Sequence, residues 1–181
     1  MEINMAIRKI REIGDPILTK VCKPVKDVTP RIAELIDDMF DTMYDANGVG
    51  LAAPQVGILK RIVVIDCGDE EEQPIVLINP EMLETRGEQC GLEGCLSVPG
   101  KSGEVRRPAY AKVKAYNEEM EEFIVEGEDL LARALCHELD HLDGHMYTEL
   151  VEGPLMTSEE AAEMMEKREM EEAAREENGE E

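Results

Sequence analysis

The stretch from Asp129 to Gly144 constrains the fold more than any other part of this chain. Inside it, His137, Glu138 and His141 form the pattern H-E-x-x-H. On an α-helix, residues four apart project from the same face, so the two imidazoles can hold one metal ion. Glu138 lies about 100° around the helix from His137, where it can reach a water on that ion but is poorly placed as a ligand. The pattern predicts a helix with two metal ligands and a proton acceptor.

A catalytic metal site of this kind needs a third protein ligand, with the fourth position left to water. In one large class of metalloproteases the pattern continues as H-E-x-x-H-x-x-G-x-x-H, but in this chain Tyr147 stands at the last position. The one other histidine, His145, directly follows the glycine expected to end the helix, so we expect it at the surface. The third ligand is therefore expected upstream.

Composition narrows the class of protein. The 181 residues suit one domain with a real core, and the formal charge of −23 argues against nucleic acid or an anionic membrane as a partner. No apolar run reaches the roughly 18 residues of a membrane span, and no signal peptide is evident. Five cysteines without an export signal argue against a disulfide framework and favour a reducing cytosol.

Cys95 is the natural candidate for the third ligand. It lies in a glycine-flanked segment, expected to be a turn between strands, where its sulfur can face the histidine helix. A thiolate with two imidazoles suits a soft or borderline divalent ion such as Zn²⁺ or Fe²⁺. The alternative for Cys95 is a buried structural cysteine, which would be the default without the histidine pair.

The segment from Gly48 to Gly57 is dense in small residues, which allow a backbone to lie very close to another group. A phosphate-binding loop is disfavoured, because no Lys-Ser/Thr follows the glycines and no strand-loop-helix unit surrounds them. Close approach to a substrate or metal centre fits better. Gln55, a polar residue among small apolar ones, is then a candidate hydrogen-bond donor; the alternative is an ordinary buried amide.

The remaining pattern predicts an α+β domain with mixed or antiparallel strands packed around the central H-E-x-x-H helix, with one helix before the sheet and one at the C-terminus. An extended arm to residue 26 precedes a helix that begins at Thr29-Pro30 and runs to about Asp45. Strands are expected at 61–67, 75–78, 82–88, 111–116, 122–125 and 147–151, with loops at 68–73 and before Arg107-Pro108.

The last part of the chain differs in composition. From Ser158 onward there are eleven Glu against three Lys or Arg, and Thr157 or Ser158 is placed to cap a solvated helix. We therefore expect a single catalytic domain at 1–151 and an acidic C-terminal helix and tail at 152–181 that is partly disordered.

Three motifs together resemble the signatures of peptide deformylase. They are Gly48–Gln55, Glu93–Ser97 and His137–His141, in the order and with similar spacing to that family, and the resemblance extends over about residues 5–150. It implies a hydrolase, with these roles for matching positions. The metal ligands would be Cys95, His137 and His141; the general base and acid Glu138; the oxyanion donors Gln55 and the backbone N–H of Leu96; and the substrate-binding residues Val49, Gly50, Leu130, Ala134 and Arg107.

For the reaction, the resemblance implies removal of the formyl group from formyl-methionyl nascent polypeptides, with release of formate. Metal-bound hydroxide would attack the formyl carbon while Glu138 carries the proton. The family metal is Fe²⁺, which Zn²⁺, Ni²⁺ or Co²⁺ can replace. We expect a monomeric, cytoplasmic bacterial protein that meets nascent peptides at the ribosome. An H-E-x-x-H metallopeptidase and a non-catalytic, metal-stabilised interaction protein are the competing hypotheses.

Overall fold

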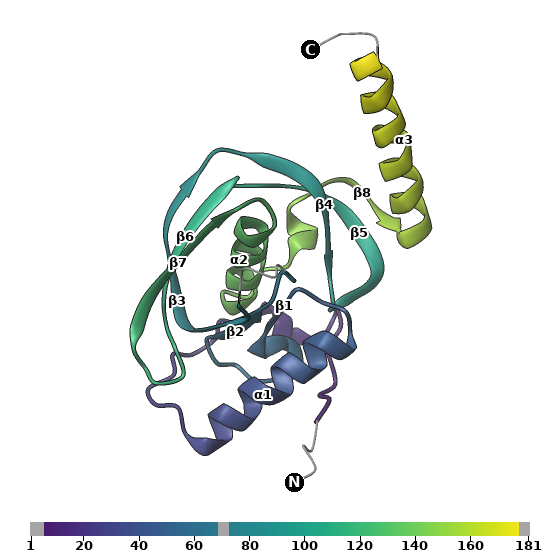
Figure 1. Ribbon diagram of the computed structural model, residues 1–181. Helices are drawn as coiled ribbons and strands as arrows, with labels where there is room; N and C mark the ends of the chain where they lie inside the picture. Colours follow the sequence, from purple (N-terminus) through teal and green to yellow (C-terminus); the bar gives the residue numbers. More distant parts are fainter. Residues whose placement is uncertain (1–5, 69–72, 178–181) are drawn as a thin grey trace.

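The histidine helix lies between two antiparallel sheets in the computed structural model, which describes residues 6–68 and 73–177 (Figure 1). The five-stranded sheet has the order β1-β2-β3-β6-β7, and the three-stranded sheet has the order β4-β5-β8. The strands are β1 (Gly50–Ala52), β2 (Ile62–Ile65), β3 (Ile75–Arg86), β4 (Gln89–Cys95), β5 (Val98–Arg107), β6 (Tyr110–Tyr116), β7 (Glu122–Glu128) and β8 (Val151–Thr157). The α-helices are α1 (Pro30–Asp45), α2 (Asp129–Leu142) and α3 (Ser158–Glu177), and the 3₁₀-helices are η1 (Pro16–Thr19), η2 (Ala53–Val56) and η3 (Tyr147–Glu149). The predicted α+β class is confirmed.

Strand β2 separates the two main parts of the core. All four of its residues are buried, and successive side chains of a strand point to opposite faces. Val63 and Ile65 pack with the buried face of α2, whereas Ile62 and Val64 pack with α1. The two helices therefore cover opposite faces of the five-stranded sheet, as Figure 1 shows.

Helices α1 and α2 have the ends that the sequence predicts. Thr29 caps α1 by accepting a hydrogen bond from the Ile32 amide at 3.3 Å, and Pro30 follows as the first helical residue. Gly144 follows the end of α2 with φ +80°, and a Cβ there would lie 2.6 Å from the carbonyl oxygen of Thr19. A glycine is required at this position because both the backbone conformation and the space exclude a side chain.

Two predictions for the second sheet were wrong. The stretch before Arg107, expected as a loop, forms β5, and residues 147–151, expected as a strand, begin with η3. Glycines at four positions in β4 and β5 disguise the strand pattern, yet at least one is required by packing: a Cβ on Gly103 would lie 2.6 Å from Val151 Cγ1. The strands expected at 75–78 and 82–88 are a single strand, β3, with two register shifts. Most of the expected 68–73 loop lies outside the described residues.

The acidic C-terminal segment begins in the sheet. Strand β8 pairs with β5, with Val105 opposite Val151 and Lys101 opposite Thr157. Helix α3 starts with a capping box, in which the Glu160 amide donates to Thr157 Oγ1 at 3.2 Å and the Thr157 amide donates to Glu160 Oε2 at 2.7 Å. Apart from the buried Ala161, the helix is largely exposed, and it projects away from both sheets (Figure 1). The division into a catalytic domain and a partly disordered tail stays a prediction.

Candidate functional site

Three side chains from two elements converge beside α2. Cys95 stands at the end of β4, and His137 and His141 lie one turn apart on α2; their ligand atoms are all within 4.8 Å of one another. Cys95 Sγ lies 3.4 Å from His141 Nε2, which lies 3.2 Å from His137 Nε2. Two imidazole nitrogens and one sulfur aimed at a common point are a donor set for a borderline divalent cation. The residues present therefore fit one metal ion.

Glu93 fixes the orientation of His137, a role that the sequence did not reveal. Glu93 Oε1 lies 2.6 Å from His137 Nδ1, so the imidazole donates this proton and turns the lone pair of Nε2 towards the cluster. Glu93 stands two residues before Cys95 on β4, and a strand places residues two apart on the same face. This spacing was the available signal.

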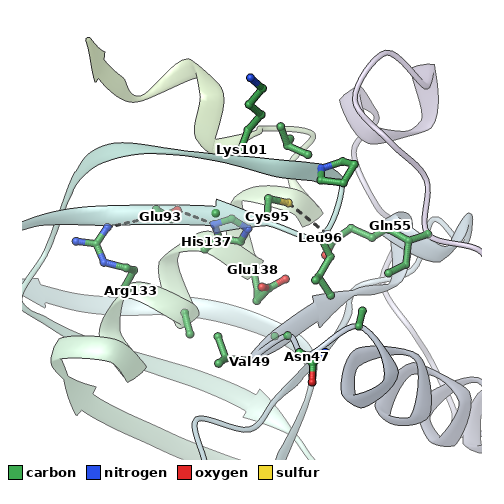
Figure 2. Close-up of a pocket in the computed structure, with 18 of the residues that line it drawn as sticks. Asn47, Val49, Gln55, Glu93, Cys95, Leu96, Lys101, Arg133, His137 and Glu138 are labelled. Atoms are coloured by element: carbon green, nitrogen blue, oxygen red, sulfur yellow. Dashed lines mark hydrogen bonds and ion pairs between the residues drawn. The ribbon is translucent and has the colours of Figure 1, made fainter. Parts of the chain in front are cut away.

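Two buried arginines hold the Glu93 carboxylate in turn. Arg107 donates to both oxygens, with Nη2–Oε1 at 2.6 Å and Nε–Oε2 at 3.1 Å. Arg133, one turn before His137 on α2, donates from Nη1 to Oε2 at 2.7 Å (Figure 2). The third contact of Arg107 is with Asp140 Oδ2 at 2.6 Å. A buried carboxylate with four charge-assisted hydrogen bonds is a rigid support for a metal-ligating imidazole.

For Glu93 and for His137, burial and the hydrogen-bond partners shift the pKa in opposite directions. Burial alone would raise the pKa of Glu93, but hydrogen bonds from His137 and Arg107 outweigh it and lower the pKa to about 2. Burial would lower the pKa of His137, yet hydrogen bonds to Cys95 and Glu93 raise it to about 10. Burial and the neighbouring His137 both lower the pKa of His141. Without a cation these shifts favour an extra proton on His137 and a neutral His141, and ligation of a metal ion by His137 requires release of that proton.

Glu138 stands at the inner end of a cleft with an unused oxygen. Its side chain is buried, and Oε2 has no hydrogen-bond partner within the described part of the chain. Burial raises the pKa of Glu138 to about 7. Gly50 passes so close that a Cβ there would lie 2.5 Å from Glu138 Oε1, and a Cβ on Gly48 would lie 2.6 Å from Leu96 Cδ1. The small residues of this segment are therefore needed for close approach, as their density predicts.

The amide of Gln55 is held in one orientation. Its Oε1 accepts from the Ala52 amide at 2.9 Å, which turns Nε2 towards Ser97 Oγ at 3.1 Å and Cys95 Sγ at 3.5 Å. The N-terminal arm supports both sides of this contact, because the Arg11 amide donates to the Gln55 carbonyl at 2.7 Å and the Ile13 amide to the Ser97 carbonyl at 2.8 Å. Gln55 therefore presents an N–H donor beside the metal cluster.

A cleft of about 550 Å³ leads to this cluster. Figure 2 shows Glu138 facing it between Val49 and Leu96, with Gln55 beside Leu96. All but two of the predicted site residues line the cleft: Val49, Gly50, Gln55, Cys95, Leu96, Leu130, Ala134, His137 and Glu138. Val49 and Leu130 are large apolar side chains left 41% and 47% exposed, a wall suited to an apolar ligand group.

The other two predicted residues lie outside the cleft lining. His141 is buried behind it in the metal cluster. Arg107, expected on the substrate path, is also buried, and its guanidinium binds Glu93 and Asp140 on the far side of the cluster. Its ion pairs draw it away from the cleft because a buried guanidinium needs carboxylate partners. Arg133, which the sequence did not single out, lines the cleft instead.

Comparisons with known proteins agree on one family. The family model described as polypeptide deformylase matches residues 7–154. A peptide deformylase of Agathobacter rectalis is 67% identical over 151 residues, which cover 83% of this chain and 94% of that protein. Peptide deformylase 1 of Clostridium acetobutylicum is 59% identical over 145 residues, covering 80% and 95%.

Solved structures give the same result. A crystal structure of a peptide deformylase from Legionella pneumophila superimposes with a TM-score of 0.78 at 41% identity, covering 96% of this chain and 98% of that one. The peptide deformylase from Thermotoga maritima superimposes with a TM-score of 0.77 at 40% identity, covering 81% and 99%. The resemblance seen in the three sequence motifs is therefore confirmed over nearly the whole chain.

Proposed function

We propose a reaction for this cleft on one premise: the chain belongs to the polypeptide deformylase family, whose enzymes remove the formyl group from nascent peptides. The substrate is then a peptide that begins with N-formylmethionine, and the products are formate and a free amino terminus. The observation that carries this proposal is the convergence of Cys95, His137 and His141 at the inner end of a cleft, beside the unpartnered carboxylate oxygen of Glu138.

Cys95, His137 and His141 would hold one divalent ion, and we propose Fe²⁺ as the native one, with Zn²⁺, Ni²⁺ or Co²⁺ able to replace it. The mixed sulfur and nitrogen donors support a borderline ion over the hard ions Mg²⁺ and Ca²⁺, which prefer oxygen. Such an ion, when bound, lowers the pKa of a coordinated water towards neutrality and polarises a carbonyl oxygen. Glu93 keeps His137 in the tautomer that ligation requires.

Glu138 would transfer the proton. A carboxyl group with a pKa near 7 can accept a proton from the attacking water and deliver it to the departing amine nitrogen at neutral pH. Glu138 lines the cleft, and within the described residues its Oε2 has no hydrogen bond that has to break first. Positioned proton transfer of this kind typically contributes a factor of about 10²–10⁴ in rate.

Gln55 and the backbone N–H of Leu96 would stabilise the negative charge that develops on the formyl oxygen. The Gln55 amide is fixed before substrate arrives, so its donor needs no reorganisation as the charge develops. One such donor is typically worth roughly 3–4 kcal/mol in the transition state. The Gly50 backbone would bind the extended peptide, and the methionine side chain would pack against Val49, Leu130 and Ala134.

Arg107 would act on the reaction indirectly. Its contacts with Glu93 and Asp140 support a role in positioning His137 rather than in binding substrate. This is a revised role for the one predicted substrate-binding residue that lies away from the cleft.

The metallopeptidase alternative is not favoured. In the H-E-x-x-H-x-x-G-x-x-H pattern the last position supplies a metal ligand, but here it holds Tyr147, which is buried with its ring stacked against His137 at a centroid separation of 5.9 Å. Cys95, at the end of β4, would supply the third ligand instead.

The setting of the reaction is also part of this proposal. The similar proteins come from bacteria, and within the described residues no helix is long and apolar enough to cross a membrane. Cys22, Cys90, Cys95 and Cys136 form no disulfide, which suits a reducing compartment. We propose a monomeric cytoplasmic enzyme that meets its nascent substrates at the ribosome.

Formate release from formyl-Met-Ala-Ser tests the assignment of Glu138. The Glu138→Gln protein should retain its metal, measured by elemental analysis, and lose at least about 100-fold in kcat. Comparable activity with bound metal would refute the proton-transfer role. Glu149→Gln, at an exposed carboxylate that pairs with His145, is the matched control and should keep the full rate.

A further inference from the structure

The charged side chains around the cleft are unequal in their freedom to bind a ligand. Besides the metal-cluster residues Cys95 and His137, the cleft is lined by four ionisable side chains: Glu93, Lys101, Arg133 and Glu138. Glu93 and Arg133 are buried and bound to each other, and Glu138 is buried and is our proposed proton carrier. Lys101 alone among the four is exposed, and in residues 6–68 and 73–177 no carboxylate forms an ion pair with it.

Lys101 stands on the wall opposite the apolar residues. It lies on β5 directly beside the end of β4, where a Cβ on Gly94 would lie 3.5 Å from the Lys101 carbonyl oxygen. In Figure 2, Cys95 and His137 separate Lys101 from Val49 and Asn47, and the Lys101 side chain extends outward from its strand. Lys101 therefore lines the wall opposite the apolar residues, and its ammonium group lies at the outer edge of the cleft on a flexible stem.

The carboxylate of Glu160, on the outer side of Lys101, already accepts a hydrogen bond. Lys101 pairs with Thr157 in the sheet, and the Thr157 amide donates to the carboxylate of Glu160 at 2.7 Å. The Glu160 carboxylate lies close enough to Lys101 for the lysine charge to lower its pKa, but among the described residues the two side chains form no ion pair. The Lys101 ammonium can therefore still turn towards a carboxylate that enters through the cleft.

We propose that Lys101 is a specificity-determining residue, which favours formyl-methionyl peptides with an acidic side chain at the second or third position. The proposal rests on the proposed deformylase function. Once the methionine side chain packs against Val49, the following side chains of an extended peptide alternate towards the two walls of the cleft. The four-carbon stem of Lys101 lets its charge reach either position.

A preference for acidic peptides would act against the net negative charge of the protein. With a formal charge of −23, the chain repels acidic peptides at long range, and Lys101 supplies a local attraction that offsets this at the cleft. An exposed ion pair changes binding by a small factor, so we expect kcat/KM for a Glu peptide to exceed that for a Gln peptide by about two- to fivefold at low salt. At 0.5 M NaCl the ratio should approach one, since salt screens exposed charges.

The test compares formate release from formyl-Met-Ala-X and formyl-Met-X-Ala, with X as Glu, Gln or Lys, using the metal-loaded full chain. In at least one series the wild type should prefer Glu over Gln over Lys, Lys101→Gln should remove the order, and Lys101→Glu should reverse it. Lys112→Glu, a similar charge change on β6 at a residue that pairs with Glu126, should leave the order unchanged.

The outcomes separate this inference from the function on which it rests. No formate from any peptide would refute the deformylase proposal itself. Formate release without a charge order in the wild type, or with an order that Lys101→Glu leaves intact, would overturn the role of Lys101 alone. An order that Lys112→Glu reverses equally would assign the effect to net charge and likewise overturn it.

Discussion

Replacement of Glu93 by glutamine should destabilise the protein and loosen its metal site together. The carboxylate is 4% exposed and accepts hydrogen bonds from His137, Arg107 and Arg133. Loss of its charge leaves two buried guanidinium groups under-compensated, and breaking such a buried network costs about 3–5 kcal/mol. For a chain of this size each kcal/mol lowers Tm by about 2–4 °C, so Tm should fall by about 6–20 °C.

The same substitution should weaken metal binding about 10–100-fold, because His137 loses the acceptor that fixes its tautomer. Glu88→Gln is the matched control: Glu88 binds Arg106 at the same 2.6 Å N–O distance as Glu93 and Arg107, but it is 63% exposed. An exposed pair contributes about 0–1 kcal/mol, so Tm should change by no more than about 4 °C.

Thermal unfolding followed by circular dichroism, with and without a chelator, measures the first effect, and elemental analysis after dialysis against graded chelator measures the second. A Glu93→Gln protein that unfolds no earlier than Glu88→Gln and retains its metal as well as the wild type would show that Glu93 supports neither the fold nor the metal site.

Three further predictions concern the same site. Cys95→Ser should lose metal during dialysis, whereas Cys136→Ser, at a buried thiol outside the cluster, should retain it; the opposite result would refute the ligand assignment. Gly50→Ala must displace the Glu138 carboxylate, so kcat should fall at least about tenfold with metal still bound, and an unchanged kcat would contradict the close approach. Burial alone would raise the pKa of Glu93, but its hydrogen bonds lower it from 4.5 to about 2, so its contribution to stability is complete above about pH 4.5 and is lost as pH falls towards 2. In metal-free protein, Tm should therefore fall more steeply over this range in the wild type than in Glu93→Gln, and equal slopes would contradict the shift.

The elements that the sequence predicted well are those whose signal is local. Helix α1 has its cap and its apolar stripe within one continuous segment, and α2 ends just before Gly144 as its sequence indicates. In the hairpin of β6 and β7, burial alternates residue by residue, between buried and half-buried in β6 and between exposed and half-buried in β7. Each of these patterns is a consequence of helix or strand periodicity alone.

The second sheet was missed because its signal is not local. Strands β4 and β5 are rich in glycine and charge, and they are strands because they pair with each other and because β5 pairs with β8. Gly103 is small because Val151, far along the chain, occupies the space that a side chain would need. Periodicity within one segment carries no information about such distant partners.

In the candidate site, too, the residues with a local sequence signal were predicted and those without one were not. The metal ligands could be proposed from residue chemistry and helical spacing, since His137 and His141 share a face and a thiol completes the donor set. The hydrogen-bond network that holds these ligands could not be proposed from the sequence. Glu93 and Arg107 meet only through strand pairing between β4 and β5, and Arg133 reaches them from α2. Arg107 was therefore placed on the substrate path when its charge is used inside the protein.

The most direct test of the account is formate release by metal-free protein to which Fe²⁺ is added back anaerobically, one fraction of an equivalent at a time. With formyl-Met-Ala-Ser as substrate, activity should rise in proportion to bound metal and reach its limit at one ion per chain, while the unformylated peptide Met-Ala-Ser stays intact. Full activity without metal, a limit at more than one ion, or cleavage of the unformylated peptide would contradict a single Cys95–His137–His141 centre that hydrolyses formamides.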